Sequence, residues 1–179
     1  SINAVANLGY AEARWLAPVY PGDTLQSVST IIGLKQNSNG KTGIVWVRTE
    51  GFNQNDVMVM SFVRWVMVRK RQPNESSFEP VVPKLKEFVA AADLVVPNNL
   101  KFTSYNTVLS GSFYFYDDYK IGDFIDHTDG VTITDAEHMM ATRLWQNTAK
   151  VHFDTSLRPD GKRLIFGGHI ISMARALSF

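Results

Sequence analysis

The sequence of 179 residues lacks several features that would narrow its chemistry at once. It has no cysteine, which excludes disulfide bonds, thiolate catalysis and cysteine-ligated zinc. It has no apolar run of the about 18 residues that a spanning helix needs, so we expect no membrane segment. The formal net charge is only +1, which argues against a nucleic-acid partner. The absence of cysteine also fits a cytoplasmic protein.

An initiating methionine is absent as well, because the sequence opens Ser1-Ile-Asn-Ala-Val5. This opening has neither the basic nor the apolar region of a signal peptide, and it is typical of the interior of a longer protein. Hydrophobic residues make up 45% and charged residues 20% of the chain, which is ordinary for a folded globular protein. Disorder of the whole chain is therefore not expected.

The first 71 residues have the pattern of β-strands separated by turns. Apolar and β-branched residues are concentrated in 9–20, 24–35, 42–49 and 57–69. The intervening turn signals are Pro21-Gly-Asp23, Asn37-Ser-Asn-Gly40 and Asn53-Gln-Asn-Asp56. Alternation in 24–35 places on one face Val28, Thr30, Ile32 and Leu34. The short turns predict a largely antiparallel sheet, and the apolar residues on both faces of 57–69 predict a strand covered on both sides.

Residues 72–112 differ from the strands that precede them. They show no clear period and carry most of the prolines, namely Pro73, Pro80, Pro83 and Pro97. We interpret this part as a linker that wraps the surface, with at most a short helix near 84–92.

Helical patterns are confined to the last third of the chain. Thr134 and Glu137 form a capping box, which predicts a helix from Asp135 to about Gln146. One stripe of that helix would contain Ala136, Met140, Arg143 or Leu144, and Asn147. After Gly167-Gly168, the apolar residues of 169–179 predict a second, buried helix.

Three segments resemble MaoC-like hot-dog dehydratases. Pro18-Val-Tyr-Pro-Gly-Asp-Thr-Leu25 resembles the turn between two hot-dog strands. Trp145-Gln-Asn-Thr-Ala-Lys-Val-His152 resembles the hydratase motif, in which an aspartate stands five positions before a catalytic histidine. Phe166-Gly-Gly-His-Ile-Ile-Ser-Met173 resembles the entry to the long hot-dog helix. Two further segments, 63–71 and 138–143, are most similar to mesaconyl-CoA (2-methylfumaryl-CoA) hydratases, also described as β-methylmalyl-CoA dehydratases.

The resemblance covers nearly the whole chain and implies an α+β hot-dog fold, an antiparallel sheet wrapped around a central helix. That family has two hot-dogs in one chain, so 179 residues would be parts of a double hot-dog. Residues 1–71 would be the strand-rich part of the first hot-dog, 72–112 the linker, and 113–179 the N-terminal part and central helix of the second. We expect these parts either to pack as one permuted hot-dog or to need complementary hot-dog segments of a partner chain, and we expect a homo-oligomer.

The resemblance also implies the reversible hydration of an α,β-unsaturated acyl-CoA, with mesaconyl-CoA and β-methylmalyl-CoA as the reacting pair. This chemistry needs a base for water at Cβ, an acid for Cα and a donor to the enolate-like thioester oxygen. His152 matches the histidine of the motif, and Asn147 stands where the family has aspartate. Asparagine can position water or an imidazole but cannot exchange a proton. Either His152 makes both proton transfers through water, or another acid helps, or the match is out of register.

The remaining site residues complete this expectation. Gly167 and Gly168 would open a helix whose free amides hold the thioester oxygen, with the amide of Gly168 as the donor. Arg143, with Arg175 as second choice, is the candidate for the free carboxylate of the acyl group. The coenzyme A phosphates would contact Arg69, Lys70 and Arg71. No cofactor is implied beyond coenzyme A as part of the substrate.

The other histidines, His127, His138 and His169, are expected to be structural. No histidine pair has metal-ligand spacing with an acidic third ligand, so no metal site is expected. Two other functions remain open at this point: a hot-dog acyl-CoA thioesterase, and a non-catalytic module that binds acyl-CoA or protein. The absence of a carboxylate from 169–179 counts against the thioesterase.

Overall fold

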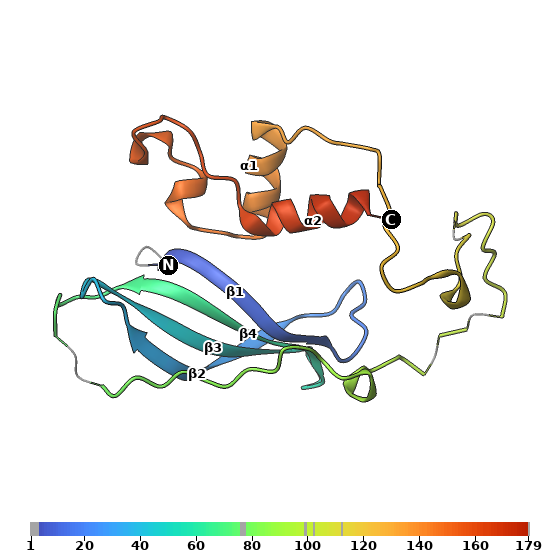
Figure 1. Cartoon of the computed structure of the whole chain (residues 1–179), viewed down its shortest axis with the longest axis horizontal. Coiled ribbons are helices and arrows are strands. Elements are labelled where there is room, and N and C mark those ends of the chain that lie inside the picture. Colours follow the sequence, from blue (N-terminus) through green and yellow to red (C-terminus); the bar gives the residue numbers. More distant parts are fainter. Residues whose placement is uncertain (1–3, 76–77, 99, 102, 112, 179) are drawn as a thin grey trace. The chain divides into compact units, whose positions relative to one another are not determined.

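The computed structural model describes residues 4–75, 78–98, 100–101, 103–111 and 113–178. Contacts between residues divide the chain into two compact units, one within 3–101 and one within 102–179. We call the first the strand unit, because it contains the β-strands, and the second the helical unit, because it contains the α-helices (Figure 1). Of the helices in these ranges, none combines the length and the apolar character needed to cross a membrane.

The strand unit is built on one four-stranded antiparallel sheet, as the turn pattern predicted. Its strands are β1 (Ala4–Trp15), β2 (Gln26–Gln36), β3 (Thr42–Phe52) and β4 (Met58–Arg69). Their order across the sheet is β1-β4-β3-β2, so the last three form consecutive hairpins and β1 pairs with β4. The two hairpin turns contain Gly40 at φ 65° and Asp56 at φ 58°, in the left-handed region that glycine and aspartate tolerate best.

Cross-strand partners define the two faces of this sheet. The first face contains, side by side, Ala11, Val63, Arg48 and Thr30. The second face contains in the adjacent row Tyr10, Arg64, Val47 and Ile31. On the first face Val63 is fully buried, whereas on the second Tyr10 and Ile31 are more than half exposed. On β4 itself the second side is less covered than the first, since Met60, Phe62 and Val66 are half-buried and Arg64 is exposed, so the expectation that both sides are covered holds only in part.

Two expected strand patterns differ from the structure, and both strands are interrupted by bulges. The first strand spans Ala4–Trp15 rather than 9–20, and its pairing with β4 is irregular at three places. In β2 the register shifts between Ile31 and Gly33, which leaves Ile32 as an extra residue. Thr30 and Leu34 consequently lie on opposite faces of the sheet, although simple alternation would put them on the same one.

The segment after β4 follows the strand unit instead of leaving it. Val81 exchanges two backbone hydrogen bonds with Leu34, each 2.9 Å long. A Cβ atom at Gly33 would lie 2.6 Å from Pro83 Cδ and 3.3 Å from Trp46 Cε3, so glycine permits this close approach. The short helix considered for 84–92 is absent, and the chain forms only a 3₁₀ turn, η1, at Ala91–Asp93. Within 84–92 the backbone N–H of Lys86 donates to the Glu12 carboxylate instead of to a helical carbonyl.

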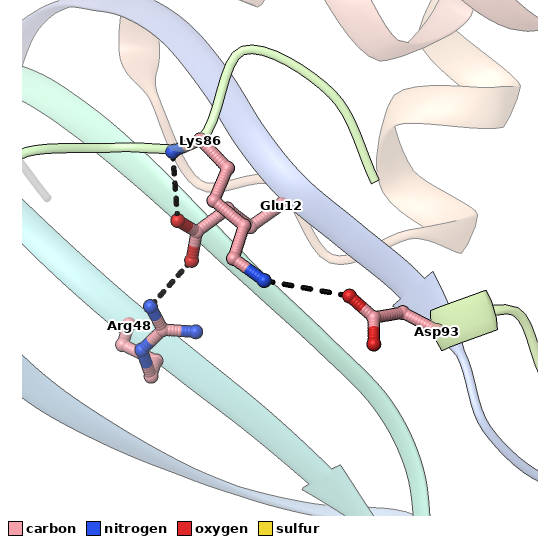
Figure 2. A network of polar contacts seen from close by, with 4 residues as sticks. All are labelled: Glu12, Arg48, Lys86 and Asp93. Carbon is pink, nitrogen blue, oxygen red and sulfur yellow. Dashed lines mark hydrogen bonds and ion pairs between the residues drawn. The ribbon is translucent and has the colours of Figure 1, made fainter. Parts of the chain in front are cut away.

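A polar network fastens this segment to the sheet (Figure 2). The Glu12 carboxylate accepts hydrogen bonds from the Arg48 guanidinium at 2.6 Å and from the Lys86 backbone N–H at 3.1 Å. The Lys86 ammonium lies 3.4 Å from Asp93. These hydrogen bonds hold the pKa of Glu12 below its ordinary value, the one from Arg48 having the largest effect. Glu12 adopts φ 53° at a bulge of β1, and this turns its carboxylate toward Arg48.

The helical unit has two α-helices with short 3₁₀ turns between them. Helix α1 (Asp135–Leu144) begins where predicted, capped by Thr134, whose hydroxyl accepts the N–H of Glu137 at 3.3 Å. The described contacts of this helix start do not include the reciprocal bond to the Glu137 carboxylate that a capping box requires. The helix ends two residues before the expected Gln146, which has φ 52° and breaks the helical path. Helix α2 (Gly167–Leu177) begins two residues before the predicted start. The predicted end at Phe179 lies outside the described residues.

The buried faces of both helices differ from those expected. In α1 the buried positions are His138 and Thr142, whereas Met140 and Leu144 of the predicted stripe are exposed. In α2 only His169 is buried, and Ile170 and Ile171 are 41% and 63% exposed. The expectation of a buried apolar second helix is therefore wrong within this chain, because the described helical unit has too few elements to cover it.

Candidate active site

His152 is the histidine that the sequence pattern singles out, and the structure places it in the helical unit. It ends the 3₁₀ turn η3 (Lys150–His152), and its side chain is buried at 9% exposure. Its Nδ1 atom lies 2.7 Å from the carbonyl oxygen of Leu164. A carbonyl can only accept, so Nδ1 carries the hydrogen and Nε2 of the neutral ring keeps its lone pair. The ring is thus held in the tautomer that a general base requires.

Asn147 shapes the turn that leads to His152. Its backbone N–H donates to the Thr142 carbonyl at 3.0 Å, and its side-chain oxygen accepts the N–H of Ala149 at 3.0 Å. This second contact is an Asx turn, a local hydrogen bond that fixes the backbone two residues ahead. Because α1 ends at Leu144, Asn147 does not continue the stripe that was expected to direct it inward. Its side-chain oxygen accepts a hydrogen bond within the turn.

Gly167 and Gly168 form the first residues of α2. The amides of a first helical turn have no acceptors within the helix, so they are available to an oxygen atom nearby. A Cβ atom at Gly168 would lie 2.6 Å from Cζ of Phe166, whereas none at Gly167 would meet an atom within 4 Å. Glycine at 168 therefore accommodates the ring of Phe166, which also lies 5.6 Å from the ring of His152 by their centroids.

The cationic candidates occupy different parts of the molecule. Arg143 lies exposed in the last turn of α1, and Arg175 lies in the last turn of α2. The carboxylate of Asp135, in the first turn of α1, contacts Arg163 at 2.8 Å.

Arg69, Lys70 and Arg71 belong to the strand unit. Lys70 donates to the side chain of Gln36 at 2.8 Å and to the carbonyl of Glu75, so its ammonium is engaged within the protein. Arg69 and Arg71 are exposed. Arg69 and Lys70 also line a cavity of about 240 Å³ whose apolar walls include Leu34, Val45, Val68 and Phe78.

The sequence did not predict that three of the histidines, His138, His152 and His169, lie close together in the structure. His138 is fully buried and His169 is 3% exposed. The His138 ring lies 6.1 Å from the rings of both His152 and His169 by their centroids. His127, by contrast, is exposed. The spacing of His138 and Thr142, four residues apart on one helical face, was the available signal, but polar residues are normally assigned to the outer face.

His138 contacts the start of α2 directly. Its Nε2 atom accepts the backbone N–H of Phe166 at 3.0 Å, and its carbonyl accepts the hydroxyl of Thr142 at 2.6 Å. Burial lowers the pKa of His138, and the nearby imidazoles of His152 and His169 lower it further. The ring is therefore neutral near pH 7. Across the described residues, no three histidine, aspartate or glutamate side chains are grouped closely enough to bind a metal ion.

Comparison with known proteins shows which families and solved structures this chain is similar to. The family described as "FAS1-like, dehydratase domain region" matches residues 5–62. A putative MaoC domain protein dehydratase from Chloroflexus aurantiacus superimposes with a TM-score of 0.94 at 55% identity, over all of this chain and 52% of that one. A conserved hypothetical protein from Mycobacterium tuberculosis, described as a double hotdog fold, gives a TM-score of 0.59 at 24% identity. The chain therefore has a hot-dog-like fold and is similar over its whole length to about half of a MaoC domain dehydratase.

Two curated relatives specify the relationship further. Mesaconyl-CoA hydratase of Cereibacter sphaeroides is 63% identical over 179 residues, and β-methylmalyl-CoA dehydratase of Chloroflexus aurantiacus is 55% identical over 182. Each alignment includes the whole of this chain but 52% of the relative. The chain is thus a homologue of these two enzymes and spans about half their length, which confirms the fold class and the family predicted from the sequence.

Proposed function

We propose that the protein containing this chain adds water reversibly to an α,β-unsaturated acyl-CoA, converting mesaconyl-CoA to β-methylmalyl-CoA. The observation that carries the proposal is the state of His152. Its Nδ1 donates to the Leu164 carbonyl, and its ring contacts Phe166, beside the first amides of α2. Whole-chain identity of 63% to a protein named mesaconyl-CoA hydratase supports this choice of substrate.

In the proposed reaction Nε2 of His152 takes a proton from water while the water oxygen bonds to Cβ. The electron pair of the double bond moves toward the thioester carbonyl, whose oxygen accepts a hydrogen bond from the Gly168 amide. The imidazolium then gives its proton to Cα, so one water molecule has been added across the double bond. Asn147 cannot exchange a proton, and in this proposal it acts by shaping the turn to His152.

Binding of the remaining substrate groups is part of the same proposal. Arg143 would hold the free carboxylate of the acyl group, with Arg175 as its alternative. Arg69 and Arg71 would contact the coenzyme A phosphates. Lys70 would add its positive charge beside them while its ammonium remains hydrogen-bonded to Gln36 and Glu75. Ion pairing by a fixed guanidinium suits both anions.

A complete site would require further hot-dog segments, from the longer polypeptide or from a second copy of the chain. The chain spans 52% of its curated relatives, and both the second sheet face and the outer face of α2 carry exposed apolar residues such as Ile31 and Ile171. Surfaces of this kind are normally covered in a finished fold. A cytoplasmic location and a homo-oligomer remain predictions.

His152→Ala in the full-length protein tests the proposal. We expect its kcat for mesaconyl-CoA hydration to fall by about 10²- to 10⁴-fold, because the proposed reaction assigns the activation of water to this imidazole. The assay follows loss of the conjugated double bond and, separately, release of free thiol. His127→Ala, an exposed position, is the matched control and should retain full activity.

Each outcome decides between functions. Thiol release without hydration by the wild-type protein would indicate a thioesterase. Tight acyl-CoA binding without either reaction would indicate a binding module. Unchanged hydration by His152→Ala would exclude His152 as the base.

A further inference from the structure

His138 makes a contact that the proposed reaction does not use. Its side chain is fully buried, and its Nε2 atom accepts the backbone N–H of Phe166 at 3.0 Å. Phe166 is the N-cap residue of α2, so this hydrogen bond fixes the backbone at the point where the helix begins. Because 28 residues separate the two partners, the bond joins α1 to the start of α2.

The ring of Phe166 connects that point to both parts of the proposed site. Its centroid lies 5.6 Å from that of His152, in an edge-on arrangement, and 6.2 Å from that of Trp145. The same ring covers Gly168 so closely that a Cβ atom there would be 2.6 Å away. A shift of the Phe166 backbone would therefore disturb both the imidazole of His152, which takes the proton, and the amide of Gly168, which holds the thioester oxygen.

We propose that His138 is a positioning residue, which holds Phe166 and through it aligns His152 with the first amides of α2. The inference rests on the proposed hydratase function and assigns His138 no contact with substrate. The role requires a neutral imidazole, since a ring protonated on both nitrogens has no lone pair for the Phe166 N–H.

Ionisable groups from each neighbouring element surround His138. They are Asp135 on the same helix, His152 on η3, His169 on α2 and Arg163 on the segment before α2. Asp135 is already paired with Arg163, and the two other histidines disfavour a further positive charge. His138 therefore accepts the Phe166 amide over the pH range in which a histidine base operates.

The first test removes the acceptor and then restores it, in the full-length protein. His138→Leu lacks a hydrogen-bond acceptor, and we expect kcat to fall by about tenfold or more with little change in KM, as misalignment of reacting groups predicts. His138→Gln offers an amide oxygen near the position of Nε2 and should recover most of the rate. It cannot be protonated, so the acid limb of its pH–rate profile should lose any contribution from residue 138.

A second pair of variants tests the hydrogen bond from the donor side, should His138→Leu fail to fold. Phe166 has φ −65°, which proline also adopts. Phe166→Ala removes the ring and keeps the N–H, whereas Phe166→Pro removes both. A lower kcat for Phe166→Pro than for Phe166→Ala is expected. Adding His138→Gln to Phe166→Pro should not raise kcat, because the N–H that residue 138 would accept is absent.

Nitrogen NMR of the histidine rings provides a readout besides activity. His138 Nε2 should show the shift of an unprotonated acceptor, and His138→Leu, which leaves the Phe166 ring in place, should change the resonances of His152 and the Gly168 amide. A kcat of folded His138→Leu within about twofold of wild type, or a protonated Nε2, would overturn the positioning role. If the wild-type protein does not hydrate mesaconyl-CoA, the proposed function fails instead, and the NMR comparison still decides whether His138 aligns His152.

Discussion

The strand unit and the helical unit bury different kinds of side chain. Among the described residues, the buried apolar side chains are all in the sheet: Trp46, Val47, Val59 and Val63. The buried residues of the two helices and η3 are His138, Thr142, His152 and His169. Burial of apolar surface stabilises the first unit in the ordinary way. The second buries ionisable rings, which costs free energy and is typical of a functional site.

The largest effect that this comparison predicts is at Val63, whose side chain is fully buried on the first face of the sheet. Val63→Asp should lower the free energy of unfolding by more than about 4 kcal/mol, because an unpaired carboxylate would be buried there. Val28→Asp, on β2 at 58% exposure, is the control and should change stability little. Chemical denaturation measures both, and a small effect at Val63 would show that the sheet is not the apolar core.

The next largest effect is a pH dependence of stability, which we expect to differ between the helical unit and the strand unit. Burial lowers the pKa of His138 below its ordinary value of 6.5, so the unfolded chain takes up this proton first as the pH falls. The contribution of His138 is fully present above pH 6.5 and decreases below it, by at most about 1.4 kcal/mol per pH unit. Hydrogen exchange in α1 should report this slope, and His138→Gln should remove it. A slope that persists in the variant would assign it to another group.

The strand unit should respond at lower pH. The pKa of Glu12 lies below its ordinary value of 4.5, so the stability from this carboxylate is present above pH 4.5 and is lost as the pH falls through the lowered pKa. Glu12→Gln should cost about 1 kcal/mol at pH 7, since the pair with Arg48 is partly exposed to solvent. Asp93→Asn, in a longer and more exposed pair with Lys86, is the control with a smaller expected loss.

The smallest effect is expected on the outer face of α2. Ile171 is 63% exposed, so Ile171→Ser should change the stability of the 179-residue chain by about 0.5 kcal/mol or less. The same substitution in the full-length protein measures whether another segment covers this face. A loss of several kcal/mol there, with none in the shorter chain, would locate the missing contact at Ile171.

The sequence predicted the elements well where one local rule decided them. Asn39-Gly40 and Asn55-Asp56 gave the hairpins, and Thr134 with Glu137 gave the start of α1. The prediction failed where it assumed regular alternation along a strand. The extra residue Ile32 reverses the face on which the following side chains of β2 lie.

The site shows the same division. Motif resemblance predicts His152 and Gly168 as site residues, and both lie against the ring of Phe166. It could not find His138, because the contact joins a side chain to a backbone N–H 28 residues away. Backbone donors are the same for every residue type except proline, so no residue identity marks such a partnership. The inward face of α1 was misassigned for a related reason, since hydropathy places His138 and Thr142 at the surface.

The segment from Phe78 to Lys86 has a geometric consequence for the sheet. It crosses the side that carries Trp46 and Arg48, through Pro83 over Gly33 and through the Lys86 amide on Glu12. This extended segment thereby occupies part of that side, and a further layer of protein there would have to pack around it. Tyr10 and Ile31 on the second face remain more than half exposed, so a further layer of protein would find apolar surface to pack against on that side.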